Sequence, residues 1–177
     1  MESKAEKFSG SQKTIIDLDG YYSNKVTVTG LNENTTYYYQ LFQDRAWKNA
    51  VKYETKSTSN FSFLLDGDPQ IVGASKKQVN GDNETLSTND SGDPEKNLAA
   101  RNDAYNWNIV LNYATAKYPN VSLMISAGDQ INSSENEAEF AGYLNASALK
   151  SLPVATTIRN HDSGTVKFCQ HFNTLNV

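Results

Sequence analysis

The chain contains a single cysteine, Cys169, which excludes an intrachain disulfide and a zinc site built from several thiolates. It also lacks an excess of basic residues. The formal net charge of −4 argues against nonspecific nucleic-acid binding, which needs basic side chains to displace counterions from phosphates. No apolar run approaches the roughly 20 residues needed to cross a bilayer. No signal peptide is expected, because charged residues follow Met1 without an apolar segment. What remains is a chain of 177 residues, enough for one ordinary domain or two small ones.

The first third of the chain has a β-type pattern. Alternating or β-branched runs predict strands at residues 25–29, 35–42 and 50–55, with a turn at residues 30–34. A polar linker at residues 56–60 follows, and we place a domain boundary there. The sequence therefore predicts a β domain at residues 1–57 and a second domain at residues 58–177.

The second domain alternates strands and helices. Short apolar runs predict strands at residues 61–65, 121–127 and 153–158, and the first of these is apolar enough to be buried on both faces. Asp93-Pro94 is typical of a helix start, which predicts a helix ending before Pro119. A capping box, Ser134-x-x-Glu137, predicts a second helix to about residue 150. This order implies a parallel sheet with helical crossovers.

Apolar residues at helical spacing mark the faces that the two helices should bury. They are Ala100, Ala104, Trp107, Leu111 and Ala114 in the first helix, and Ala138, Ala141, Leu144 and Ala148 in the second. The stretch before the first helix, residues 76–93, is rich in Asn, Asp, Gly, Ser and Thr. Its acidic residues lack the regular spacing of a calcium loop, so we expect an exposed loop there.

Polar residues follow each of the three predicted strands. Asp68, Asp129 and Asn160 stand just beyond the strand ends, and His161 adjoins Asn160. Ligands of parallel sheets bind at the carboxyl ends of the strands, and oxygen ligands suit hard or borderline divalent metals. A carboxylate between two metal ions could bridge them, as in sites for phosphoester displacement. For a single such residue, an ordinary turn or helix cap is the simpler interpretation; three in succession favour chemistry.

Two resemblances add to these patterns. Leu31, Thr35 and Tyr37 resemble the Leu-x-Pro-x-Thr-x-Tyr signature of fibronectin type III domains, with Glu33 at the usual proline position. In that family the tyrosine closes a corner by bonding to nearby backbone. A complete domain of this kind needs about seven strands and about 100 residues, so the resemblance implies a partial β-sandwich with exposed edges and an uncovered apolar face.

Gly67-Asp68, Gly128-Asp129 and Asn160-His161-Asp162 resemble the first three motifs of calcineurin-like metallophosphoesterases. With a fibronectin-like module before them, they are similar to the purple acid phosphatase branch. The resemblance implies the N-terminal half of the family's α/β sandwich and two metal ions, iron, zinc or manganese. Asp68 would bind the first ion, Asp129 would bridge both and Asn160 would bind the second. His161 would contact phosphate or act as the general acid.

The chain departs from the family pattern at several positions. Gln70 stands where many members have a metal-binding histidine, and Asn132 stands where purple acid phosphatases have an iron-binding tyrosine. Arg159 replaces the glycine before Asn-His and could strain the loop or contact phosphate. The family's later histidine motifs do not occur before Val177, and His171 comes too early to be one of them. Gln70, Arg159 and His171 are therefore candidates for substrate contacts, and His171 is equally well explained as structural.

These observations predict a phosphoester hydrolase that uses a hydroxide activated by two metal ions. This chain would be a catalytically incomplete part of it, without the C-terminal half of the domain, and would bind metal weakly. The resemblance implies an extracellular or cell-surface location. Two alternatives stay open: a phosphatase homologue that has lost activity, suggested by Arg159, and a noncatalytic β-module that binds a glycan or surface ligand through tyrosines 21, 22, 37, 38 and 39.

Overall fold

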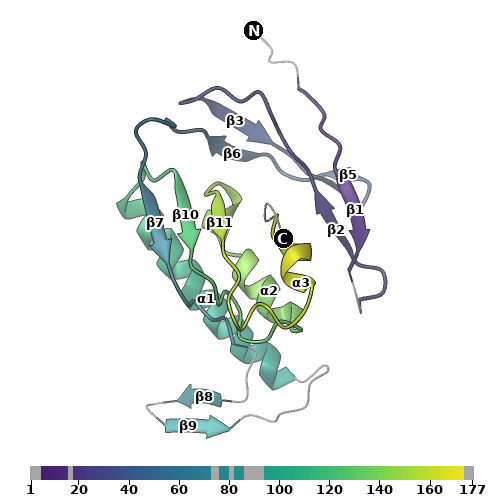
Figure 1. Cartoon of the computed structure of the whole chain (residues 1–177), viewed down its shortest axis with the longest axis vertical. Helices are drawn as coiled ribbons and strands as arrows, with labels where there is room; N and C mark the ends of the chain where they lie inside the picture. Colours follow the sequence, from purple (N-terminus) through teal and green to yellow (C-terminus); the bar gives the residue numbers. More distant parts are fainter. Residues whose placement is uncertain (1–4, 16–17, 73–75, 80–81, 86–93, 174–177) are drawn as a thin grey trace.

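A computed structural model describes residues 5–15, 18–72, 76–79, 82–85 and 94–173, with only the backbone at 76–79, 82–85 and 94–102. It combines several small sheets with three α-helices, which confirms a mixed β and α fold in coarse terms (Figure 1). Among these residues, no helix is long and apolar enough to span a membrane.

The N-terminal part forms separate two-stranded antiparallel sheets. β1 (Ser11–Thr14) pairs with β2 (Tyr22–Lys25), β3 (Thr36–Tyr39) pairs with β6 (Val51–Glu54), and β4 (Phe42–Gln43) pairs with β5 (Ala46–Trp47). The predicted strands at residues 35–42 and 50–55 are confirmed in their central residues. The strand predicted at residues 25–29 is wrong, because pairing to β1 places the strand earlier and ends it at Lys25.

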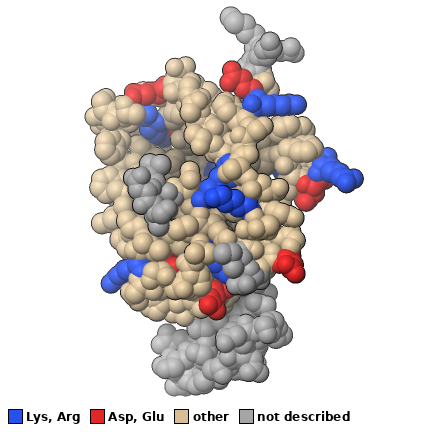
Figure 2. All heavy atoms as spheres, turned by 45° about the vertical axis from the view of Figure 1, so that its right-hand side comes forward, with Lys and Arg blue, Asp and Glu red and all other residues tan. Residues whose placement is uncertain are grey.

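The tyrosine hydroxyl of Tyr37 accepts a hydrogen bond of 2.8 Å from the backbone N–H of Asn32. This is the local contact that the Leu31-Thr35-Tyr37 pattern predicts. Many other aromatic side chains of this part stay in solvent, as expected for small sheets that cannot cover both faces. On the side of β1, β2 and α3, residues other than Lys, Arg, Asp and Glu make up most of the surface (Figure 2). The exposed aromatic residues of the N-terminal part are Phe8, Tyr21, Tyr22, Tyr38, Tyr39, Phe42 and Trp47.

The C-terminal part contains the predicted parallel sheet. β7 (Phe63–Asp66), β10 (Leu123–Ser126) and β11 (Val154–Thr156) pair in the order β11-β10-β7, all parallel. α1 (Pro94–Lys117) and α2 (Glu137–Leu144) lie on one side of this sheet (Figure 1). The short helices η1 (Ser147–Lys150) and α3 (Lys167–His171) follow α2 and β11 respectively. The central strand β10 therefore carries its loop to the middle of the sheet's carboxyl edge.

One face of the sheet carries the core, which corrects the prediction that the first strand is buried on both faces. Phe63 and Leu65 of β7 are 49% and 71% exposed, because β7 is an edge strand and their face is uncovered. The opposite face packs on aromatic and aliphatic side chains from the helices. The large, fully buried residues of this core are Ile71, Met124, Ile131, Phe140, Tyr143 and Phe168.

The first helix is confirmed, and Trp107 and Leu111 of its predicted stripe are buried. Asp93 and the side chain of Ala100 lie outside the described residues. The capping box is wrong: the side chain of Asn136, not of Ser134, accepts from the backbone N–H of Ala138 and starts α2.

The residues of α2 that face the core differ from those predicted. Phe140 and Tyr143 are buried, whereas Ala141 and Leu144, which were predicted to face inward, are exposed. Ala148 is buried as predicted, although it belongs to η1 rather than to α2. The predicted loop at residues 76–93 is also wrong in part, since β8 (Lys76–Val79) and β9 (Asp82–Thr85) form a hairpin within it.

The β1–β2 hairpin contacts α3 at the far end of the chain. The ammonium group of Lys25 donates to the carbonyl oxygens of Cys169 and Phe172, at 2.6 and 2.9 Å. The hydroxyl of Ser23 donates to the carbonyl of Gln170 at 2.5 Å. A lysine at the C-terminal carbonyls of a helix satisfies acceptors that have no partner within the helix.

Candidate functional site

After β7 and β10, the polypeptide continues as two neighbouring segments that are joined by backbone hydrogen bonds. The residues that follow the two strands therefore stay close together. The N–H of Asp68 donates to the carbonyl of Gly128 at 3.2 Å, and the N–H of Gln70 donates to the carbonyl of Asp129 at 2.9 Å. The β11 chain joins them through Thr157, whose N–H bonds Ser126. We call residues 67–71, 128–132 and 157–162 the strand-end loops.

Several residues of these loops adopt left-handed backbone angles. Asp68, Gln70 and Asp129 have φ values of 61°, 41° and 54°, and Gly128 has a φ of 98°. Residues other than glycine rarely occupy this region, and those that do gather at functional sites. The concentration of strained positions in two adjacent loops marks this edge of the sheet as the candidate site.

Asp68 and Asp129 face a common point, and we call them the acid pair. The Oδ2 atom of Asp129 lies 3.2 Å from Nη1 of Arg159, and Oδ2 of Asp68 lies 3.6 Å from the same nitrogen. The Asp129 carboxylate is buried, whereas the side chains of Asp68 and Arg159 are about half exposed. The structure thus brings together two of the predicted metal ligands, with a guanidinium group between them.

His161 is attached to the acid pair by its backbone. Its N–H donates to Oδ1 of Asp129 at 3.0 Å, and its ring Nδ1 lies 2.8 Å from the carbonyl oxygen of Asn132. A carbonyl only accepts, so Nδ1 must carry the hydrogen, which leaves Nε2 to exchange a proton with a ligand. Asn160, the third predicted ligand, is exposed beside it. His161 is therefore oriented by contacts on two sides.

Gln70 and Asn132, at which the sequence departs from the motifs that it resembles, lie next to each other. The side-chain amide of Gln70 donates to Oδ1 of Asn132 at 3.4 Å. Gln70 is a predicted substrate contact, and Asn132 had no assigned role. Their proximity places Gln70 in the strand-end loops, on the same edge of the sheet as the acid pair.

Asp162 organises the site, although the sequence assigned it no role. Its carboxylate is fully buried and accepts the backbone N–H groups of Asp129, Gln130 and Arg159, at 2.7, 3.0 and 3.2 Å. Burial raises the pKa of this carboxyl group, while the backbone donors act in the opposite direction. Only its place in a run of polar residues after a strand could have singled out Asp162.

A polar network lies beneath the acid pair. The hydroxyl of Ser126 donates to Oδ2 of Asp66 at 3.4 Å, and the amide of Gln130 donates to Ser126 at 3.0 Å and to the carbonyl of Thr157 at 3.2 Å. Burial raises the pKa of Asp66. Gln130 therefore connects β10 to the loop after β11, because its side-chain amide contacts Ser126 in β10 and Thr157 in that loop. Asp66 is a further acidic group at this edge that the sequence analysis missed.

His171, the remaining predicted site residue, belongs to α3. Its ring stacks on Phe140 with centroids 4.2 Å apart, and its Nε2 lies 2.9 Å from Oε2 of Glu137. These described contacts attach α3 to α2. They support a structural role, and substrate contact by His171 stays a prediction without a contact to support it.

The environment of His171 makes a pH-dependent stability measurable. Burial lowers the pKa of the imidazole, and the nearby Glu137 carboxylate opposes this only in part. The folded protein therefore favours neutral His171. The stabilisation is fully present above the unfolded-state pKa of 6.5 and is lost as pH falls through the folded-state pKa. As pH falls from above 6.5 through the folded-state pKa, the wild-type protein should lose more unfolding free energy than His171→Gln, which has no imidazole to protonate.

Denaturant unfolding at a series of pH values measures this difference, and NMR titration of the His171 ring gives the pKa directly. A ring that titrates at or above its ordinary value would contradict the prediction.

The described residues contain no cluster of three or more His, Cys, Asp or Glu side chains that could hold a metal ion.

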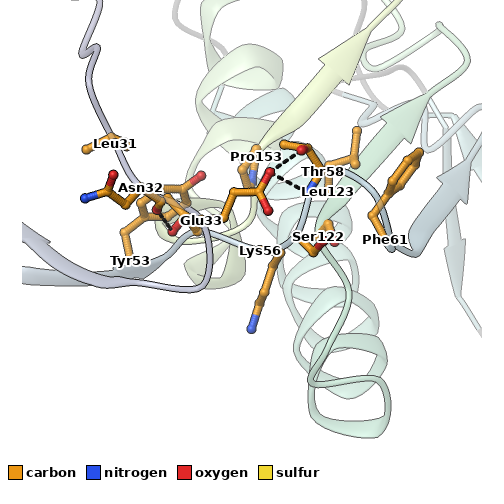
Figure 3. Close-up of a pocket in the computed structure, with 12 residues that line it drawn as sticks. Leu31, Asn32, Glu33, Tyr53, Lys56, Thr58, Phe61, Ser122, Leu123 and Pro153 are labelled. Atoms are coloured by element: carbon orange, nitrogen blue, oxygen red, sulfur yellow. Dashed lines mark hydrogen bonds between the residues drawn. The ribbon is translucent and has the colours of Figure 1, made fainter.

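A surface pocket lies at the opposite end of the sheet, where the N-terminal part meets the starts of β7, β10 and β11 (Figure 3). Within it, Glu33 accepts hydrogen bonds from the backbone and hydroxyl of Thr58. Ligands of parallel sheets bind at the carboxyl ends of the strands, whereas this pocket lies at their amino ends. We therefore interpret the pocket as part of the contact between the N-terminal and C-terminal parts.

No family model matches the chain, and no curated protein or solved structure matches it significantly.

Proposed function

We propose that the strand-end loops form the first half of a two-metal site in a phosphoester hydrolase, and that this chain is catalytically incomplete. The observation that carries the proposal is the convergence of Asp68 and Asp129 on one cationic atom, beside the backbone-bound His161. Carboxylates from adjacent parallel strands that share one cation have the donor chemistry that hard and borderline divalent metals prefer.

Two further features support this proposal. The strained backbone of Asp68, Gln70 and Asp129 is of the kind that persists where function requires it. The contact between Gln70 and Asn132 also brings together the two positions at which the metallophosphoesterase motifs carry a further metal ligand. The finer fold that goes with the proposal is a partial fibronectin-like β-sandwich followed by the N-terminal half of a metallophosphoesterase domain.

The donors fit half of such a site. Asp68 would hold one metal ion, Asp129 would bridge two, and the exposed Asn160 would add an oxygen ligand to the second. Bound iron, zinc or manganese would polarise phosphoryl oxygens and activate water near neutral pH. His161 supplies the protein's own chemistry: with Nδ1–H held by the Asn132 carbonyl, the imidazolium form can donate its Nε2 proton to a leaving oxygen and is left as the neutral Nδ1–H tautomer.

A second candidate is a phosphatase homologue without activity. The observation that favours it is the guanidinium group of Arg159, which lies between the two carboxylates that would otherwise bind metal. The two candidates share a fold and a site, and they differ in whether a divalent ion reaches the acid pair.

Metal content per chain tests the proposal. After dialysis against Mn²⁺ or Zn²⁺, we expect well under two metal ions per chain and little hydrolysis of a phosphomonoester, because three oxygen donors make an incomplete shell. Whatever metal is bound should be lost in Asp129→Asn. Elemental analysis and isothermal titration calorimetry measure both quantities.

Asp44→Asn is the matched control, because Asp44 is an exposed turn residue that carries the same charge and whose ion pair among the described residues is with Lys48. Equal metal binding by the wild-type protein and Asp129→Asn would contradict the proposed site. Full occupancy with rapid turnover would contradict the conclusion that the site is incomplete.

A further inference from the structure

Arg159 places a positive charge where the two carboxylates of the acid pair face each other. Its Nη1 atom lies within 4 Å of both Asp129 and Asp68, at 3.2 and 3.6 Å. The two acids come from loops after different strands, and both carboxylates contact this one cation. Two like charges at close range repel, and a single guanidinium between them offsets that repulsion.

The backbone of Arg159 is held in place by the same loops. Its N–H donates to Oδ2 of Asp162 at 3.2 Å. Its Cβ passes so near Gly128 that a Cβ added to that glycine would lie 2.6 Å from it. The absence of a side chain at Gly128 is what admits an arginine here. The guanidinium therefore starts from a fixed point beside the acid pair.

A divalent ion at the acid pair would need the same carboxylate oxygens that Arg159 contacts. Because the guanidinium and the ion are both positive, they repel each other and cannot share this position. The apparent affinity of a site falls by the fraction of molecules in which the site is open. An acid pair that is closed by Arg159 in about nine molecules of ten would bind metal about tenfold more weakly.

We propose that Arg159 is the resident cation of the acid pair, and that a metal ion binds there only by displacing it. The second half of this statement rests on the proposed function, and the first half does not. A role for Arg159 in binding phosphate is disfavoured, because two carboxylates already balance its charge. A bound anion would be a third negative group close to these carboxylates and would be repelled by them.

Mn²⁺ titration of matched variants tests the inference. Arg159→Gln removes the charge while keeping a long polar side chain, and it should bind Mn²⁺ at least about tenfold more tightly than the wild-type protein. Arg45→Gln is the control, because Arg45 is an exposed residue of the β4–β5 turn and carries the same charge. The gain should vanish in Arg159→Gln/Asp129→Asn, which shows that the added affinity resides on the acid pair.

A metal-free double-mutant cycle separates the two halves. In EDTA, Asp129→Asn should destabilise the wild-type protein more than it destabilises Arg159→Gln, because only the wild-type protein has an ion pair to lose. Equal Mn²⁺ affinity in the wild-type protein and Arg159→Gln overturns the competition and leaves the proposed function standing. Absence of Mn²⁺ uptake in both, with coupling present in the cycle, overturns the proposed metal site and supports Arg159 as resident cation. Absence of coupling overturns the inference.

Discussion

Replacing Asp162 with alanine should lower the free energy of unfolding by about 3–5 kcal/mol. The buried carboxylate accepts hydrogen bonds from the N–H groups of Asp129, Gln130 and Arg159. Its removal leaves the N–H groups of Asp129 and Gln130 buried without this partner, each at a cost of about 1–3 kcal/mol, and removes the partly buried bond to Arg159. The loss is large against a total stability of about 5–15 kcal/mol, so denaturant unfolding is best begun at low temperature.

Asp162→Asn is a milder substitution that keeps the protein folded and should cause a smaller loss of unfolding free energy. Its single carbonyl oxygen can still face Asp129 and Arg159, while its amide group faces the N–H of Gln130 and loses that bond. We expect about half of the alanine effect. Amide hydrogen exchange should speed up at Asp129, Gln130 and Arg159 more than at Met124 in the centre of β10. Asp19→Ala, at an exposed position without a left-handed φ, should cost less than about 0.5 kcal/mol. Uniform exchange across the sheet would contradict a local role for Asp162.

The parallel sheet could be predicted because its signals are local. Three short apolar runs separated by helical patterns leave few topologies, and the structure confirms both the strands and their direction. The exposure of β7 could not be predicted. Phe63 and Leu65 are apolar in sequence whether or not another layer covers them, so composition does not report what packs against an edge strand.

The errors in α2 have a similar cause. Ser134 and Asn136 are both good N-caps, and the choice depends on a contact outside the helix. The carboxylate of Glu139 accepts the N–H groups of Asn132 and Ser133, which holds residues 132–133 in the loop and leaves Asn136 as the cap. Within α2, the large side chains of Phe140 and Tyr143 fill the core in place of the smaller residues that the spacing predicted.

The sequence predicted the two acidic residues of the candidate site, but not the residues that hold them in place. The proximity of Asp68 and Asp129 follows from adjacent parallel strands, which a sequence pattern can indicate. The position of the Arg159 guanidinium and the hydrogen bonds to Asp162 depend on side-chain directions in a loop. No periodicity encodes these directions, so the cation between the two acids became visible only in the structure.

Gly128→Ala should destabilise the protein by about 2–5 kcal/mol, through two separable effects. Gly128 has a φ of 98°, which an L-residue adopts only with strain of about 1–2 kcal/mol. The added Cβ would also lie 2.6 Å from Cβ of Arg159, so the loop after β11 must move, at a further cost of about 1–3 kcal/mol. Gly30→Ala isolates the first effect, because Gly30 has a φ of 77° and open space around its Cβ position.

Arg159→Gly isolates the second effect. It removes the Cβ that the new methyl group meets and leaves the Arg159 backbone nitrogen, at 3.3 Å, as the nearest atom. Gly128→Ala should then cost no more in the Arg159→Gly background than Gly30→Ala costs in the wild-type protein. Denaturant unfolding of the four proteins in this cycle measures the coupling. Additive effects would mean that the two loops do not touch at this point, and that the guanidinium is not held over the acid pair by its own backbone.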